Sequence, residues 1–157
     1  MTQHDRVVVK LGGSLLDWPT WPAAFATWWE TESYRQPILV TGGGRRVEQI
    51  RARNRQQRLD PTLAHWECIA AMSETAHQVA EQLFRHGLPT ELLDAAAPEL
   101  SRRNGGTRSI VVLNVARWLR QRVDRRVFSS DARDSFEPQL GLLPIGWEIT
   151  SDSIAAF

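Results

Sequence analysis

Val7-Val8-Val9-Lys10-Leu11-Gly12-Gly13-Ser14 is the stretch that decides the fold, because it joins a short apolar run to a pair of glycines. An apolar run bounded by glycine is typical of a buried strand in a parallel sheet, so we expect a strand over residues 6–12. The glycines permit a tight turn in which backbone N–H groups converge on an anion. Lys10 would direct a compact positive charge to the same place. The stretch therefore predicts a phosphate site that contains Lys10, Gly12, Gly13 and Ser14.

Lys10 is the only lysine in a chain that has eighteen arginines. An arginine fork suits bidentate binding of a fixed anion, whereas an ammonium group can follow charge that develops on a moving phosphoryl group. The alternative is a strand-end lysine that simply reaches solvent. The glycines and Ser14 favour the phosphate site, because a solvated lysine has no need of them.

Length and composition limit the possible classes of protein. The chain has 157 residues, so we expect a single domain over residues 1–157 with a core of its own. A net charge of +1 favours neither nucleic acid nor a membrane surface as partner. The single cysteine, Cys68, excludes an internal disulfide framework and fits a reducing compartment. No signal-peptide core and no bilayer-length apolar stretch is evident, so a cytoplasmic location is expected.

Strand and helix patterns alternate along the rest of the chain. Further strands are expected at 37–41, 90–94 and 109–113, and helices from Pro19 or Pro22 onward, over 46–57, 61–86 and 115–123, and from about Ser151. This alternation predicts an α/β fold, a three-layer α/β/α sandwich with a mainly parallel central sheet. Such sheets bind ligands at the carboxyl ends of their strands.

Two of the predicted helices carry regular apolar stripes. Trp21, Phe25 and Trp28 lie at i, i+4 and i+7, and we expect them in the core rather than around a ligand. The long helix is expected to end at Gly87 as its C-cap. Its inner stripe consists of Ile69, Met72, Ala76, Val79 and Leu83.

Two common glycine motifs do not fit this chain. The P-loop places its lysine after the glycines, whereas Lys10 precedes Gly12. A dinucleotide site needs a third, spaced glycine, which is missing after Gly42-Gly43-Gly44. Neither nucleotide-binding class is therefore supported by its motif.

Three motifs remain: Lys10-Leu11-Gly12-Gly13-Ser14, Thr41-Gly42-Gly43-Gly44 and Thr150-Ser151-Asp152-Ser153-Ile154-Ala155-Ala156. Together they resemble the amino acid kinase family, which includes acetylglutamate, aspartate, uridylate and isopentenyl phosphate kinases. Ala64-His65-Trp66 with Ala71-Met72, and Trp147-Glu148-Ile149 before the last motif, are most similar to the aminomethyl-furan-methyl phosphate kinases of methanofuran biosynthesis. The resemblance to the family covers nearly the whole chain, whereas that to the subfamily rests on two short stretches.

The resemblance implies a set of roles. Lys10 would stabilise the transferring phosphoryl group, Gly12, Gly13 and Ser14 would bind phosphate, and Asp152 would orient catalytic lysines. Gly42, Gly43 and Gly44, together with Ser151, would hold the acceptor. ATP would be the donor, with Mg²⁺ bridged by the nucleotide phosphates and no metal ligand from the protein. The acceptor would be a small phosphorylated or carboxylated molecule, and the family resemblance suggests a dimer through the long helices.

Several residues have both a functional and a structural interpretation. Arg45 and Arg46 oppose the dipole of a helix that starts beside them unless an anion is near, so they either bind the acceptor or point into solvent. His65 either contacts substrate or is a satisfied core residue. Asp152 is either catalytic or a first-turn carboxylate that complements a helix dipole.

The basic half of the 46–57 helix is the last ambiguous feature. Four arginines without interleaved aromatic residues favour a solvated face over a nucleic-acid surface. They are Arg51, Arg53, Arg55 and Arg58.

The chain also departs from the family that it resembles. Family members carry a further C-terminal portion with the adenine pocket and a second catalytic lysine, and no second lysine exists here. We therefore expect acceptor binding to survive better than ATP turnover. Two functions stay open: an ATP-dependent small-molecule kinase or its acceptor-binding half, and an inert kinase-like module that binds a phosphorylated metabolite or a partner subunit.

Overall fold

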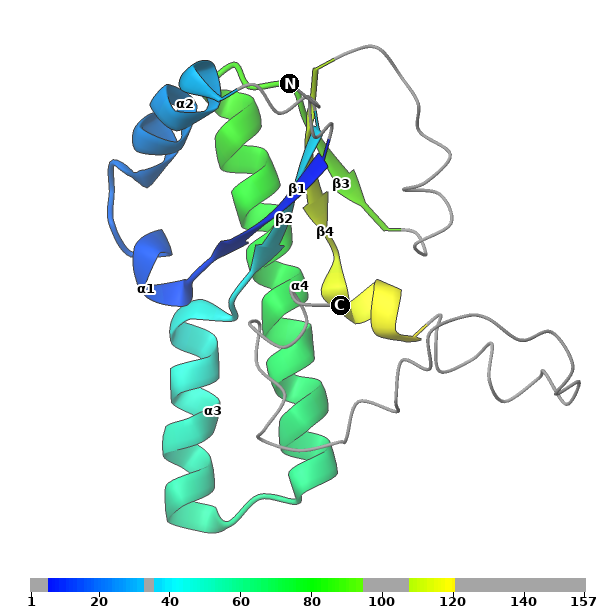
Figure 1. Ribbon diagram of the computed structural model, residues 1–157. Coiled ribbons are helices and arrows are strands. Elements are labelled where there is room, and N and C mark those ends of the chain that lie inside the picture. Colours follow the sequence, from blue (N-terminus) through cyan, green and yellow to red (C-terminus); the bar gives the residue numbers. More distant parts are fainter. Residues whose placement is uncertain (1–5, 33–35, 95–107, 121–157) are drawn as a thin grey trace, which may run out of the picture.

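The computed structural model describes residues 6–32, 36–94 and 108–120 (Figure 1). Ser151 and Asp152, together with the helix expected there, lie outside these residues. The described part contains the first two of the three motifs. It therefore shows how the two glycine turns are placed relative to each other.

Within the described residues, four parallel strands form a sheet, which confirms the predicted α/β class. They are β1 (Arg6–Leu11), β2 (Gln36–Thr41), β3 (Thr90–Leu93) and β4 (Ile110–Leu113), in the spatial order β1-β2-β4-β3. The register places Lys10 beside Val40 and Leu11 beside Thr41. Because every neighbouring pair is parallel, all carboxyl ends lie along one edge of the sheet. Both glycine turns begin at that edge.

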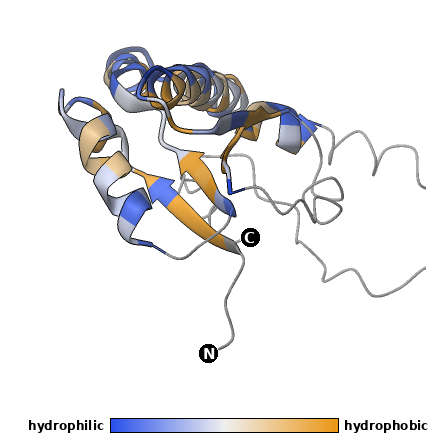
Figure 2. Ribbon diagram, turned by 90° about the horizontal axis from the view of Figure 1, so that it is seen from above, coloured by the Kyte–Doolittle hydropathy of each residue, from blue (hydrophilic) through white to orange (hydrophobic). Residues whose placement is uncertain are grey.

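The helices are α1 (Gly13–Leu16), α2 (Trp21–Thr31), α3 (Gly44–Gln57) and α4 (Pro61–Arg85), with a further helical segment over 115–120. Figure 1 shows α3 and the first half of α4 as an antiparallel pair that extends past the carboxyl ends of the strands. The second half of α4 lies across the sheet. Figure 2 shows the apolar strands beneath α4, with α2 to one side. None of the helices in the described ranges is both long and apolar enough to cross a bilayer.

Alternate strand residues pack into two different clusters, as the two faces of a pleated sheet require. Leu39, Ile110 and Val112 belong to the first cluster, together with residues of α2 and the second half of α4. Val40 and Val111 belong to the second cluster, with residues of the first half of α4 and of the 115–120 segment. The long helix therefore contributes to both clusters, because it runs on beyond the sheet edge.

The apolar face of α2 contains the predicted residues and one more. Trp21 and Phe25 are buried as expected, but the third buried ring is Trp29, whereas Trp28 is only half-buried. Trp28 nevertheless packs against the first cluster, with its ring centroid 5.1 Å from that of Phe25, so its expected place at the core is confirmed. Trp29, at i+8, widens the inner face by one position. Arg108 adds to the burial of Trp29: its guanidinium stacks 3.9 Å from the ring centroid and donates to the Trp29 carbonyl.

The predicted stripe of α4 is confirmed, since all five of its residues are buried. The helix ends in a Schellman motif: Leu88 N donates to the Leu83 carbonyl (3.1 Å) and Gly87 N to that of Phe84 (2.9 Å). His86 is the capping residue and Gly87 follows it at φ +77°. Glycine is favoured there because the left-handed region is costly for residues with a Cβ atom.

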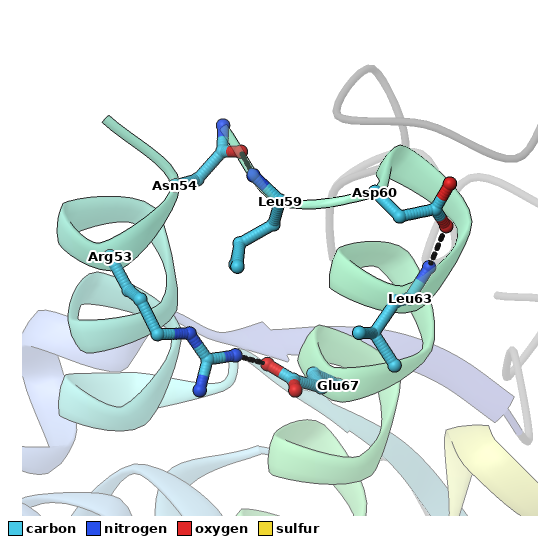
Figure 3. Close-up of polar contacts among 6 residues, drawn as sticks. All are labelled: Arg53, Asn54, Leu59, Asp60, Leu63 and Glu67. Carbon is cyan, nitrogen blue, oxygen red and sulfur yellow. Dashed lines mark hydrogen bonds and ion pairs between the residues drawn. The ribbon is translucent and has the colours of Figure 1, made fainter. Parts of the chain in front are cut away.

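Side chains at the turn between α3 and α4 hold the two helices together (Figure 3). Asn54 Oδ1 accepts a hydrogen bond from Leu59 N (2.9 Å), and Asp60 Oδ1 accepts one from Leu63 N (2.9 Å). Arg53 forms an ion pair with Glu67 across the helix pair. The turn is therefore specified by local side-chain contacts.

Replacing Asp60 by alanine should destabilise the protein by about 1 kcal/mol, because α4 would lose the side chain that caps its N-terminus. Urea unfolding monitored by tryptophan fluorescence would measure the loss. Asp60→Ser is the matched control, since serine retains a capping oxygen. Equal stability of the alanine and serine variants would contradict the capping role.

Candidate functional site

The two glycine turns are in direct backbone contact at the carboxyl edge of the sheet. Gly42 N donates to the Leu11 carbonyl at 2.9 Å, which extends the β1–β2 pairing into the turns. A Cβ atom on Gly13 would lie 2.9 Å from both Cα and N of Gly44. A Cβ atom on Gly42 would lie 3.0 Å from Gly13 N. The absence of side chains at these positions is therefore what lets the turns approach each other.

Lys10 lies on β1, one residue before Leu11, whose carbonyl joins the two turns. Leu11 points into the first cluster, so Lys10 lies on the opposite face of the strand, where its side chain is exposed. Exposure agrees with a lysine that meets a ligand and with one that meets solvent. What the fold adds is position, since Lys10 is at the same sheet edge as both turns.

The helix α3 begins within the second glycine turn. Its N-cap is Gly43, and no side chain accepts a hydrogen bond from the first turn of the helix at that position. Gly44 adopts φ +56°, a left-handed conformation that favours glycine. The first backbone N–H groups of a helix have no partner within the helix and attract anions. The first turn of this 14-residue helix lies beside Gly13, so its N–H groups are near the first glycine turn as well.

One turn of α4 fixes the position of the second glycine turn. Thr41 is fully buried, and its hydroxyl donates to the Met72 carbonyl at 3.2 Å. A Cβ atom on Gly43 would lie 3.5 Å from the Ala71 Cβ atom. Met72 thus binds one end of the segment that leads into α3, and Ala71 lies close to the other.

The next residue of α4 holds the carboxyl end of β4. Ser73 Oγ donates to Asn114 Oδ1 at 2.8 Å, and Asn114 Nδ2 donates to Asp94 Oδ1 at 2.7 Å. Asn114 N also donates to the Leu93 carbonyl at 3.0 Å. Asn114 is buried, and its polar groups join β3, β4 and α4. The same helical turn therefore organises the ends of three strands.

Two ion pairs hold the arginines at the start of α3. Arg45 Nε lies 2.8 Å from Asp17 Oδ1, and Arg46 Nε lies 3.4 Å from Glu74 Oε2. These carboxylates supply negative charge that offsets the unfavourable position of two cations at a helix N-terminus. Asp17 is the C-cap residue of α1, so its pair with Arg45 spans the two glycine turns.

His65 is buried on α4, with its ring at 5.3 Å and nearly perpendicular to that of Trp66. It precedes Ala71 by six residues, which is about 9 Å along a helix. His65 therefore lies well down α4 from the turn that contacts Gly43. The structure places it among core residues and does not bring it to the glycine turns.

Two arginines on the basic face of α3 form ion pairs with carboxylates. Arg51 pairs with Glu48 at 2.5 Å, and Arg53 pairs with Glu67 of α4. These pairs agree with the expected solvated helix face, and the second one also links α3 to α4.

Burial raises the pKa of the nearby Cys68 thiol. The positive charge of Arg51 lowers this pKa, whereas the negative charges of Glu67 and Glu48 raise it further.

The structure brings together most of the site residues that the described ranges contain: Lys10, Gly12, Gly13, Ser14, Gly42, Gly43, Gly44 and Arg45. The sequence motifs contain Thr41 and Ala71 without revealing their contacts, and they do not include Asp17 or Asn114. These contacts depend on chain segments that are far apart in sequence. The sequence also gave no sign that Gly13–Leu16 is a helical turn. One signal for such contacts was available in the sequence: Asn114 is a polar residue directly after a buried strand.

The comparison with known proteins agrees with this arrangement of a parallel sheet and two glycine turns. The family model described as the amino acid kinase family matches residues 5–157. No curated protein sequence matches the chain. A match over almost the whole length is decisive for membership, and the chain therefore belongs to the amino acid kinase family.

Proposed function

We propose that this chain is a kinase-like protein whose site serves phosphoryl transfer from ATP to a small anionic acceptor, a phosphomonoester in particular. Membership of the amino acid kinase family supports a kinase-like phosphotransferase. The observation that carries the proposal is the backbone contact between Gly13 and Gly44 at the sheet edge where Lys10 stands. Two turns this close can present N–H groups to neighbouring phosphates.

The residues of the site fit a phosphate group. No side chain caps the backbone N–H groups at the start of α3, and a Cβ atom on Gly12 would meet nothing within 4 Å. Lys10 supplies a full positive charge at the same edge of the sheet. Phosphoryl transfer leaves a protein mainly with positioning and charge stabilisation, which a lysine and two N–H-lined turns can provide.

Donor and acceptor would occupy different turns. Lys10, Gly12, Gly13 and Ser14 would hold the transferring phosphate, while Gly42, Gly43, Gly44 and Arg45 would hold the acceptor. ATP, when bound, would supply the γ-phosphoryl group, with Mg²⁺ bridged by its phosphates. Ser151 remains a proposed acceptor contact, and Asp152 a proposed carboxylate that orients Lys10. His65 is not included in the proposed site, because it lies about 9 Å along α4 from the residue that contacts Gly43.

The resemblance to the methanofuran-pathway kinases suggests the finer substrate class. We propose a phosphomonoester of the kind used in that cofactor synthesis. A cytoplasmic homodimer is proposed from composition and from the family resemblance, with neither nucleic acid nor membrane as partner.

A second function is favoured by one observation. Lys10 is the only lysine of the chain, whereas active members of the family use two. This supports a catalytically inert kinase-like module that binds a phosphorylated metabolite or a partner subunit. The inert module would still bind the acceptor at the second glycine turn but would not transfer phosphate.

Transfer of label from γ-labelled ATP with Mg²⁺ to a panel of phosphomonoesters separates the two functions. The active kinase predicts a labelled product with at least one member of the panel. The inert module predicts binding of a phosphomonoester by calorimetry without labelled product. If the chain neither binds a phosphomonoester nor transfers label to one, both proposals are refuted.

A further inference from the structure

The ion pair between Arg45 and Asp17 connects the two glycine turns by a second route, outside their backbone contact. Arg45 directly follows Gly44, the residue that touches Gly13. Asp17 caps the C-terminus of α1, which begins at Gly13. Leu15 N donates to the Gly12 carbonyl at 3.1 Å, and Trp18 N donates to the Leu15 carbonyl at 3.1 Å. The position of Asp17 is therefore set by the first glycine turn.

The pair contributes little to the stability of the fold. The Arg45 side chain is 79% exposed and that of Asp17 is 46% exposed, and ion pairs this accessible to water add little to stability. The backbone contact between the turns does not need it. The ion pair instead sets the direction of the Arg45 guanidinium, which the positive N-terminus of α3 would otherwise repel.

We propose that Asp17 is a positioning residue for Arg45, holding its guanidinium across the two glycine turns, where it meets the anionic group of the acceptor. The inference rests on the proposed function and names a residue through which that site is organised. A guanidinium that is already directed recognises a phosphate more tightly than one that samples many rotamers. The contact with Asp17 uses Nε of Arg45, so the terminal N–H groups of the same guanidinium can meet a phosphate while Asp17 stays in place.

Removing Asp17 has two effects of opposite sign. Loss of its charge reduces repulsion of an anionic ligand, while loss of its contact releases Arg45. Screening by salt weakens the repulsion at this exposed position. We therefore expect the loss of orientation to dominate in the single variant.

The test uses the full chain and phenyl phosphate as the probe, with dissociation constants from calorimetry and thermal midpoints from fluorescence. Asp17→Ala should weaken binding about two- to fivefold, the size expected of an exposed ion pair, and should leave the thermal midpoint within about 2 °C. Asp17→Glu should restore most of the affinity. Glu48→Ala is the matched control, because Glu48 pairs with Arg51 on the same helix, away from the turns.

A double variant separates positioning from simple charge. In an Arg45→Gln background, Asp17→Ala should no longer weaken binding and should leave it unchanged or slightly tighter. An equal loss in both backgrounds, or no loss in the single variant, would overturn the role of Asp17. If the parent chain itself binds no phenyl phosphate, the proposed function fails together with this inference. If the parent binds and Lys10→Met abolishes binding while Asp17→Ala has no effect, only the inference fails.

Discussion

Replacing Lys10 by methionine should abolish binding of phosphate ligands and leave thermal stability nearly unchanged. Methionine matches the length of the side chain but removes the one ammonium group that the chain places at this sheet edge. A charge aimed at a phosphoryl group accounts for a large part of its stabilisation, so we expect a loss of at least about 100-fold. Because the Lys10 side chain is exposed, the substitution removes little packing. Calorimetry with phenyl phosphate and with ATP and Mg²⁺ would measure the effect.

Lys10→Arg is the control for charge. Arginine keeps the positive charge but presents a planar fork, so ground-state binding should survive in part while any transfer activity falls. If the Lys10→Met variant binds phosphate as well as the parent protein does, Lys10 is only a solvated lysine at the end of a strand. The assignment of the site would then be wrong, even though the family membership would stand.

Replacing Gly13 by alanine should separate the two glycine turns. The added Cβ atom would lie 2.9 Å from both Cα and N of Gly44, and these are backbone atoms that cannot rotate away. One turn must therefore move, at an expected cost of about 1–3 kcal/mol in stability. Phosphate binding should fall by at least tenfold, about 1.4 kcal/mol, because the N–H groups of the two turns no longer face the same space.

Gly12→Ala is the matched control for this substitution. Gly12 is the adjacent residue in the same turn, yet a Cβ atom there would meet nothing within 4 Å, and its φ of −65° suits any residue. Its stability should stay within about 1 kcal/mol of the parent. Urea unfolding and calorimetry on both variants provide the comparison. Similar behaviour of the two variants would show that the contact between the turns is unimportant.

The strands and helices were predictable because their causes are local. The apolar run of β1, the glycines that follow it and the cap of α4 by Asp60 each act over a few residues. Some helix boundaries differ from the prediction by a few residues. The helix was expected from about Arg46, but α3 starts at Gly44, whose φ of +56° is left-handed and still belongs to the turn rather than to regular helix.

The site was predictable only in part. The residue types at the two glycine turns indicated an anion, and the alternation of elements placed both turns at one edge of a parallel sheet. The prediction for His65 shows the limit of such reasoning. Helical periodicity correctly placed it on an inner face, but it could not show that this part of α4 runs beyond the sheet and away from the turns.

The amino-acid sequence by itself determined the class of fold, the order of the strands and longer helices, and the chemistry of the two glycine turns, because each follows from neighbours in the chain. Only the tertiary structure decided that Gly13 touches Gly44, that Arg45 reaches Asp17 and that Asn114 joins Ser73 to Asp94. These contacts depend on strand register and on where α4 crosses the sheet. Both are settled by packing of the whole core, which no short stretch of sequence encodes.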